Sequence, residues 1–82
     1  MARSAHGENN YLTLVLRGNY AKALYQDPSA TLDDLNEAVT TLEETAPVAR
    51  RVFGGAHPLT EGIEHDMRGA RAALRAREGA SS

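Results

Sequence analysis

The chain has 82 residues, a length that allows one small domain and excludes a two-domain enzyme with a cleft between its halves. It contains no cysteine, which excludes disulfides, zinc ribbons and iron–sulfur clusters held by thiolates. Hydrophobic residues make up 41% and charged residues 24%, a globular composition, and the net charge of −2 argues against a dedicated nucleic-acid binder. Stability must therefore come from helix packing or from association.

The sequence shows neither a membrane span nor a secretion signal. Its longest apolar stretch, residues 11–16, is far shorter than the roughly 20 residues that cross a bilayer. The first ten residues lack the apolar segment of a secretory signal. We therefore expect no membrane insertion and an intracellular, cytoplasmic location.

A first helix is predicted for residues 9–26 by apolar residues that recur at three- and four-residue steps. This stripe consists of Leu12, Val15, Leu16, Tyr20, Ala23 and Leu24. Leu14, Ala21 and Tyr25 fall off the stripe, so we expect them to be exposed. The segment 27–29, Asp-Pro-Ser, ends the helix, because a residue before proline avoids the α conformation.

A second helix starts after Thr31, a residue suited to the N-cap, with Asp33 and Asp34 in the first turn near the positive end of the helix dipole. Its stripe comprises Leu35, Ala38 or Val39, Leu42, Ala46, Ala49 and Val52 or Phe53. Gly54 and Gly55 provide a C-cap. The stripe keeps its phase across Pro47, which predicts a kink there without a break.

A third helix opens at Pro58, because proline is well suited to the first helical position, and His57 before it is expected to act as a capping residue. Its apolar seam comprises Leu59, Ile63, Met67, Ala70 and Leu74. No segment alternates as a strand does, so the predicted fold is all-α, with three antiparallel helices. We expect a helical unit at residues 9–77 between flexible tails at 1–8 and 78–82.

The first and third helices resemble each other when they are aligned at an offset of 47 residues, from Thr13 to Thr60. The alignment also pairs Leu16 with Ile63, Asn19 with Asp66, Tyr20 with Met67, and Ala23 with Ala70. Such self-similarity is typical of helical repeats, in which no unit buries its apolar face alone.

The run 49–60, Ala-Arg-Arg-Val-Phe-Gly-Gly-Ala-His-Pro-Leu-Thr, is similar to the junction between kinesin-light-chain-type tetratricopeptide repeats, where His-Pro-x-Thr opens a helix A. The segment 13–24, with Asn19-Tyr20-Ala21, resembles the helix A of that family, and residues 38–42 resemble helix B. The pattern is most similar to divergent members from unicellular algae. The resemblance implies about one and a half repeats, a helical hairpin followed by the next helix A, and a scaffold that binds proteins without a cofactor.

Catalytic and metal-binding chemistry finds no support in the residue pattern. Glu64, His65 and Asp66 are consecutive, so on a helix they point about 100° apart and cannot converge on one ion. The serines lie in tails or in a turn, and no triad, phosphate loop or metalloprotease motif is present. We expect a protein that is not an enzyme and that carries no cofactor or metal.

Two groups of residues are candidates for partner binding. Arg68, Arg71 and Arg75 form a basic ridge on the third helix, which is either a solvated face with Glu64 paired to Arg68 or a site for an anionic partner. Tyr11 and Tyr25, at the two ends of the first helix, either pack against the core or take part in an interface.

The leading hypothesis from the sequence is a non-catalytic protein–protein interaction module. One and a half repeats leave helix faces uncovered, including Leu14, Ala21 and Tyr25 of the first helix, which predicts a homo-oligomer or a subunit of a larger assembly. The alternative is an anionic-surface or nucleic-acid binder that acts through the ridge of Arg68, Arg71 and Arg75, a function that the net charge disfavours.

Overall fold

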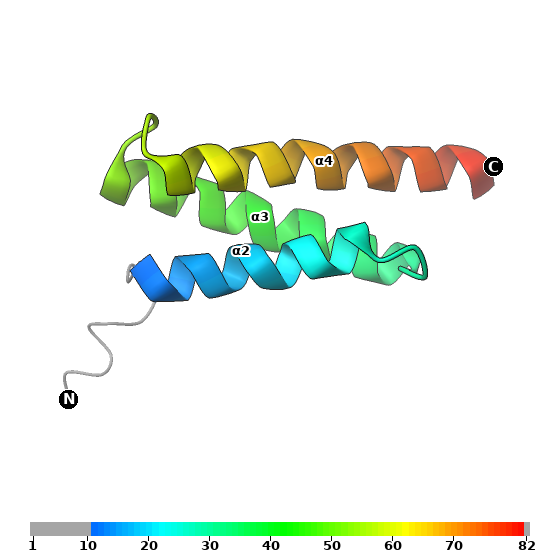
Figure 1. The fold of residues 1–82 in the computed structure, drawn as a ribbon. Coiled ribbons are helices and arrows are strands. Elements are labelled where there is room, and N and C mark those ends of the chain that lie inside the picture. Colours follow the sequence, from blue (N-terminus) through cyan, green and yellow to red (C-terminus); the bar gives the residue numbers. More distant parts are fainter. Residues whose placement is uncertain (1–10, 82) are drawn as a thin grey trace.

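A computed structural model describes residues 11–81 of the chain, which form three α-helices joined by short loops. The helices are α2 (Tyr11–Gln26), α3 (Leu32–Phe53) and α4 (Pro58–Ser81). Figure 1 shows that α2 and α4 run in the same direction and that α3 runs in the opposite one. The predicted all-α fold is therefore confirmed. The expected tail at 1–8 and the expected helix start at residue 9 lie outside the described residues.

Both ends of α3 are capped as the sequence predicts. The hydroxyl of Thr31 accepts a hydrogen bond from the backbone N–H of Asp34, and the Asp34 carboxylate accepts one from the N–H of Thr31, each at 3.1 Å. This reciprocal arrangement is a capping box, which satisfies two backbone donors at the helix start. At the other end Gly54 takes a φ of 91°, a conformation that favours glycine, and its N–H donates to the carbonyl of Arg50.

The helix α3 continues through Pro47 without a break, as predicted. Proline has no N–H to donate to the carbonyl four residues earlier, so the ladder of helix hydrogen bonds lacks one member at this point. Packing of the apolar residues on both sides of Pro47 against the other helices compensates for this loss. The kink expected here stays a prediction.

His57 and Pro58 start α4 together, which confirms the predicted capping role of the histidine. Its Nδ1 accepts a hydrogen bond of 3.0 Å from the N–H of Leu59. The helix then extends to Ser81, four residues beyond the predicted end at Arg77. Alanine, arginine and glutamate favour helix in this segment, and the Arg77 guanidinium donates to the carbonyl of Ala30 at 2.6 Å, which ties α4 to the loop between α2 and α3.

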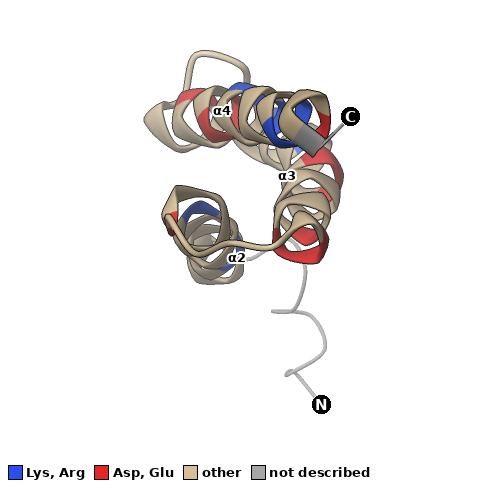
Figure 2. Ribbon diagram, turned by 90° about the vertical axis from the view of Figure 1, so that its right-hand side faces the viewer, with Lys and Arg blue, Asp and Glu red and all other residues tan. Residues whose placement is uncertain are grey.

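The helix α3 lies beside both other helices, and α2 and α4 also touch each other (Figure 2). The seams predicted on α3 and α4 are confirmed, and of the two alternatives at the end of the α3 seam Phe53 packs against the core whereas Val52 is 42% exposed. The buried core cluster consists of Leu14, Ala21, Ala38, Leu42, Ala46, Ala49, Ile63 and Ala70. No helix between residues 11 and 81 has both the length and the apolar content that a bilayer span requires.

The predicted phase of α2 is wrong. Its buried residues are Leu14, Gly18 and Ala21, whereas Leu12, Leu16 and Tyr20 of the expected stripe are exposed. The small residues at 18 and 21 let α2 approach its neighbours closely: a Cβ at Gly18 would lie 3.5 Å from Cγ1 of Ile63. Because α2 carries apolar residues on both sides, periodicity alone does not determine which side is buried.

The internal alignment inherits the same error. At the offset predicted from the sequence, the exposed Leu16 is paired with the buried Ile63, and the exposed Ala23 with the buried Ala70. The inward-facing residues of the two helices do align with each other, but at an offset that is two residues larger. Leu14, Gly18, Ala21 and Tyr25 correspond in this way to Ile63, Met67, Ala70 and Leu74.

Candidate interaction surfaces

The side of α2 that points away from the core is apolar. We call it the outer face of α2 and define it by Leu12, Leu16, Tyr20 and Ala23, which recur at four-, four- and three-residue steps. The exposed fractions of Leu12, Leu16 and Tyr20 are 60%, 58% and 50%. Three large apolar side chains in one row on a monomer surface are characteristic of an interaction site, whereas scattered ones are ordinary.

The outer face of α2 has charged neighbours on its two sides. The only charged residues of α2 are Arg17 and Lys22, so the helix carries no acidic residue. From α3, Glu37 reaches the outer face: its carboxylate accepts a hydrogen bond of 2.6 Å from the hydroxyl of Tyr20. This hydrogen bond to an acidic group is the main reason that the pKa of Tyr20 lies above its ordinary value. The ring of Tyr20 is thus held in place at the surface.

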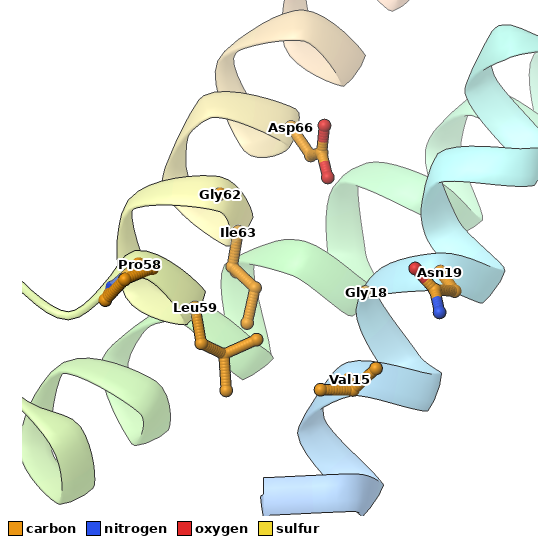
Figure 3. Close-up of a pocket in the computed structure, with 8 residues that line it drawn as sticks. All are labelled: Val15, Gly18, Asn19, Pro58, Leu59, Gly62, Ile63 and Asp66. Carbon is orange, nitrogen blue, oxygen red and sulfur yellow. The ribbon is translucent and has the colours of Figure 1, made fainter.

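A small cavity of about 160 Å³ lies between α2 and α4 (Figure 3). Its α2 wall consists of Val15, Gly18 and Asn19. The α4 wall is built from Pro58, Leu59, Gly62, Ile63 and Asp66. The cavity exists because Gly18 and Gly62 contribute no side chains to it. It is wide enough for one or two side chains of a partner and too small for a typical cofactor.

A second and wider groove, of about 480 Å³, lies between α3 and α4. Ala46, Pro47 and Met67 line its apolar part. Two ion pairs cross from helix to helix in this groove. Arg50 binds Glu64 with two hydrogen bonds of 2.9 and 3.0 Å, and both Nε and Nη2 of Arg71 donate to Glu43, at 3.0 and 2.8 Å.

The bidentate pair of Arg50 and Glu64 corrects the expectation that Glu64 pairs with Arg68 along α4. Local spacing favours the partner four residues away, but α3 places a guanidinium opposite Glu64 whose planar geometry matches both carboxylate oxygens. These pairs are solvent-exposed and each contributes little to stability. Both pairs join α3 to α4 beside their shared apolar core.

The predicted basic ridge is present on α4 but is not a uniform patch. Arg68, Arg71 and Arg75 are all exposed. Arg71 is neutralised by Glu43, and Figure 2 shows acidic positions on the neighbouring α3 and on α4 itself. Arg68 and Arg75 have no hydrogen bond or ion pair to another residue of the described segment. The ridge therefore offers two available cations in a mixed-charge surface.

The remaining candidates of the sequence divide into three environments. Leu14 is 0% exposed, so its expected role in partner binding is wrong. Tyr25 is half-buried and its hydroxyl donates to Asp66 at 2.9 Å. Burial and that hydrogen bond raise the pKa of Tyr25. Tyr11 is exposed and meets the ring of Phe53 edge-on, with 5.7 Å between the ring centres.

The run Glu64-His65-Asp66 spreads its side chains over different parts of the bundle. Glu64 contacts α3 through Arg50, and Asp66 contacts α2 through Tyr25. His65 between them is exposed. These carboxylates hold helices together, which gives both of them a structural explanation.

Comparison with known proteins yields no relative of this chain: no protein-family model, no curated protein and no solved structure matches it. The resemblance to tetratricopeptide repeats therefore stays a prediction. The exposed surfaces of α2 and α4 are therefore the evidence on function.

Proposed function

We propose that the protein is a non-catalytic interaction module that binds another polypeptide through the outer face of α2. The observation that carries the proposal is that α2 is apolar on both sides. Its inner side is covered by α3 and α4, and its outer side exposes Leu12, Leu16 and Tyr20. A surface helix normally has one apolar side, so a second apolar side is typical of a helix that packs against a further partner.

The neighbouring structure supports this proposal. The outer face of α2 is held on a rigid scaffold, because Leu14 and Ala21 anchor the helix in the core and Glu37 fixes the hydroxyl of Tyr20. A preorganised apolar row with an aromatic member loses little entropy when a partner covers it. The cavity beside it, between α2 and α4, offers room for a side chain of the same partner.

The alternative function, binding of nucleic acid or another anionic surface through Arg68, Arg71 and Arg75, has weaker support. One of its three cations is already paired with Glu43, and the ridge adjoins acidic residues. Phosphate binding needs several cations that act together, and it weakens steeply as salt rises. We retain it as a second candidate because Arg68 and Arg75 are exposed.

The proposal can be tested by photo-crosslinking in cells that produce the protein. A photoreactive amino acid replaces Leu16 on the outer face of α2 and, in a matched control, the exposed Thr40 on α3. We expect protein adducts from position 16 and a much weaker yield from position 40. Equal yields at both positions, or none at either, would contradict the proposal.

A variant extends the test to the apolar contacts themselves. Leu16→Glu places a charge at the centre of the outer face and should remove adducts formed from a photoreactive residue at position 12. Its far-ultraviolet circular dichroism should remain helical, because Leu16 is 58% exposed in the isolated chain. For the ridge, nucleic-acid binding that survives replacement of Arg68, Arg71 and Arg75 by alanine would eliminate the second candidate.

A further inference from the structure

The charges beside the outer face of α2 indicate what covers it. Counting about 100° per residue, Arg17 lies about 60° from Tyr20 around the helix, on the side away from Leu16. Asn19, on the opposite flank, lines the cavity shared with α4. The flank of Arg17 is therefore the one beside α3, from which Glu37 accepts the hydrogen bond of Tyr20. Arg17 forms no ion pair within the described segment, and the Glu37 carboxylate has no cationic partner there. One flank therefore carries an available cation and an available anion.

We propose that the outer face of α2 pairs with the same face of a second copy of the chain. The two helices run antiparallel, and the two-fold axis between them lies at the height of Gly18 along the helix. This inference rests on the proposed function and names its partner. The apolar row is centred on this point, so Leu16 of one copy meets Tyr20 of the other, and Leu12 meets Ala23 or Leu24. A two-fold interface must be complementary to itself, and this one is.

The charges fit the same arrangement. When two identical helices pair antiparallel, each flank of one helix lies beside the same flank of the other, which runs in the opposite direction. Position 17 of one copy then lies opposite position 19 of the other, which is about 1.5 Å along the helix from Tyr20 of that copy. Arg17 is therefore near the Glu37 carboxylate to which this Tyr20 donates. Arg17 and Glu37 would form two equivalent ion pairs across the axis. In a parallel pairing each flank would face the opposite flank of the partner, so Arg17 would lie away from the partner's Glu37 and both ion pairs would be lost.

The size of the surface predicts a weak dimer. The 16 residues of α2 span about 24 Å, so a single helix pair covers less area than a standard interface. Interfaces at this lower end are transient. We therefore expect an average molar mass that rises from one chain toward two as concentration increases from about 10 µM to about 1 mM.

Charge reversal tests the pairing specifically. Arg17→Glu and Glu37→Arg each turn both ion pairs into repulsive contacts, so each variant alone should dissociate about tenfold more readily in light scattering or sedimentation equilibrium. When the two variants are mixed, each mixed dimer has two attractive pairs again, and its affinity should return to that of the original chain. Lys22→Glu and Glu44→Arg are the matched controls. They make the same two kinds of charge reversal at positions away from the two-fold axis and should leave dimerisation unchanged.

The outcome that overturns the pairing is clear in the same experiment. A mixture that dissociates like the separate variants, or an original chain that stays monomeric up to about 1 mM, would show that the face is not self-complementary. Helicity measured by circular dichroism confirms that each variant is folded. Adducts from position 16 to a different protein, combined with a monomeric chain, would reject this inference and leave the proposed function standing.

Engineered cysteines determine the orientation, and the absence of native cysteine makes the result simple to interpret. A mixture of Leu12→Cys and Ala23→Cys chains should form the mixed disulfide in preference to either symmetric one, because antiparallel pairing brings these two positions together. Preferential formation of the Leu12→Cys symmetric disulfide would indicate a parallel pair and would contradict the antiparallel arrangement.

Discussion

The helix pair α3 and α4 differs sharply from α2 in how its polar and apolar residues are arranged. Each of α3 and α4 has one apolar seam and a charged opposite face, and two ion pairs join their surfaces. By contrast, α2 has apolar residues on both sides and only two charges, both basic. The difference teaches that α3 and α4 each need only their one seam covered, whereas α2 has a second apolar side suited to further packing.

The largest expected effect comes from a comparison of the free energy of unfolding after leucine is replaced on the inner and on the outer side of α2. Leu14→Ala creates a cavity in the core and should lower the free energy of unfolding by about 2–5 kcal/mol. Leu16→Ala removes the same atoms from the outer face and should cost less than about 0.5 kcal/mol at concentrations where the chain is monomeric. Urea denaturation followed by circular dichroism measures both, and similar losses in the two variants would mean that α2 is turned differently.

The sequence was sufficient to predict α3 and α4, because their signals agree with one another. Thr31 and Asp34, Gly54, and His57 with Pro58 mark helix ends chemically, and each adjoins a single apolar seam. Such a seam has only one side that can be buried. The starts of α3 and α4, the end of α3 and the residues of their shared core could therefore be predicted from the sequence.

The orientation of α2 could not be predicted in the same way. The apolar rows that begin at Leu12 and at Leu14 have similar spacing, and the buried row depends on Gly18, which periodicity treats as a gap. Only tertiary packing selects the row with small residues, because it lets α2 approach α4. The sequence did contain one usable signal: the segment from Tyr11 to Gln26 has only two charged residues, so its charge pattern does not mark one side of the helix as the solvent side.

The candidate site was predictable only to the level of residue types. The ion pair of Arg50 and Glu64 joins residues that are far apart in sequence, so local spacing favoured Arg68 as the partner instead. For the same reason the hydrogen bond between Tyr20 and Glu37 was not foreseen. Cross-helix partners require a known packing arrangement, which a single sequence does not provide.

Removal of a buried hydroxyl in α4 should raise the stability of the protein and allows a comparison of α4 with α2. The Oγ1 atom of Thr60 is buried and has no hydrogen-bond partner among residues 11–81. Thr60→Val keeps the branched shape and removes the unsatisfied group, so it should raise the free energy of unfolding by about 1 kcal/mol. Thr13→Val at the aligned but half-buried position of α2 is the control and should change stability less. Thermal denaturation of both variants tests this; a loss of stability in Thr60→Val would indicate that its hydroxyl has a partner in solution.

The ion pairs that join α3 and α4 should contribute only modestly. Arg50→Ala or Arg71→Ala removes an exposed pair and should lower stability by about 0.2–1 kcal/mol at low salt. The loss should shrink in about 1 M sodium chloride, where the Debye length falls to about 3 Å. Arg68→Ala, which removes an exposed arginine without a partner in the described segment, is the matched control. A loss that does not depend on salt would assign the effect to packing of the arginine stem.

The smallest effect concerns the contact between α2 and α4, where Tyr25 donates to Asp66. Burial and this hydrogen bond raise the pKa of Tyr25 in the folded chain above its value in the unfolded chain. The stabilisation is therefore fully present below about pH 10, the unfolded value, and is lost as pH rises through the folded value, because the Tyr25 hydroxyl must then give up the proton that it donates and become a tyrosinate beside a carboxylate. Tyr25→Phe should flatten this alkaline decline measured by chemical denaturation. Tyr11→Phe removes the hydroxyl of an exposed tyrosine at the other end of α2 and should leave the decline unchanged, so an equal response of the two variants would show that the contact between Tyr25 and Asp66 does not cause it.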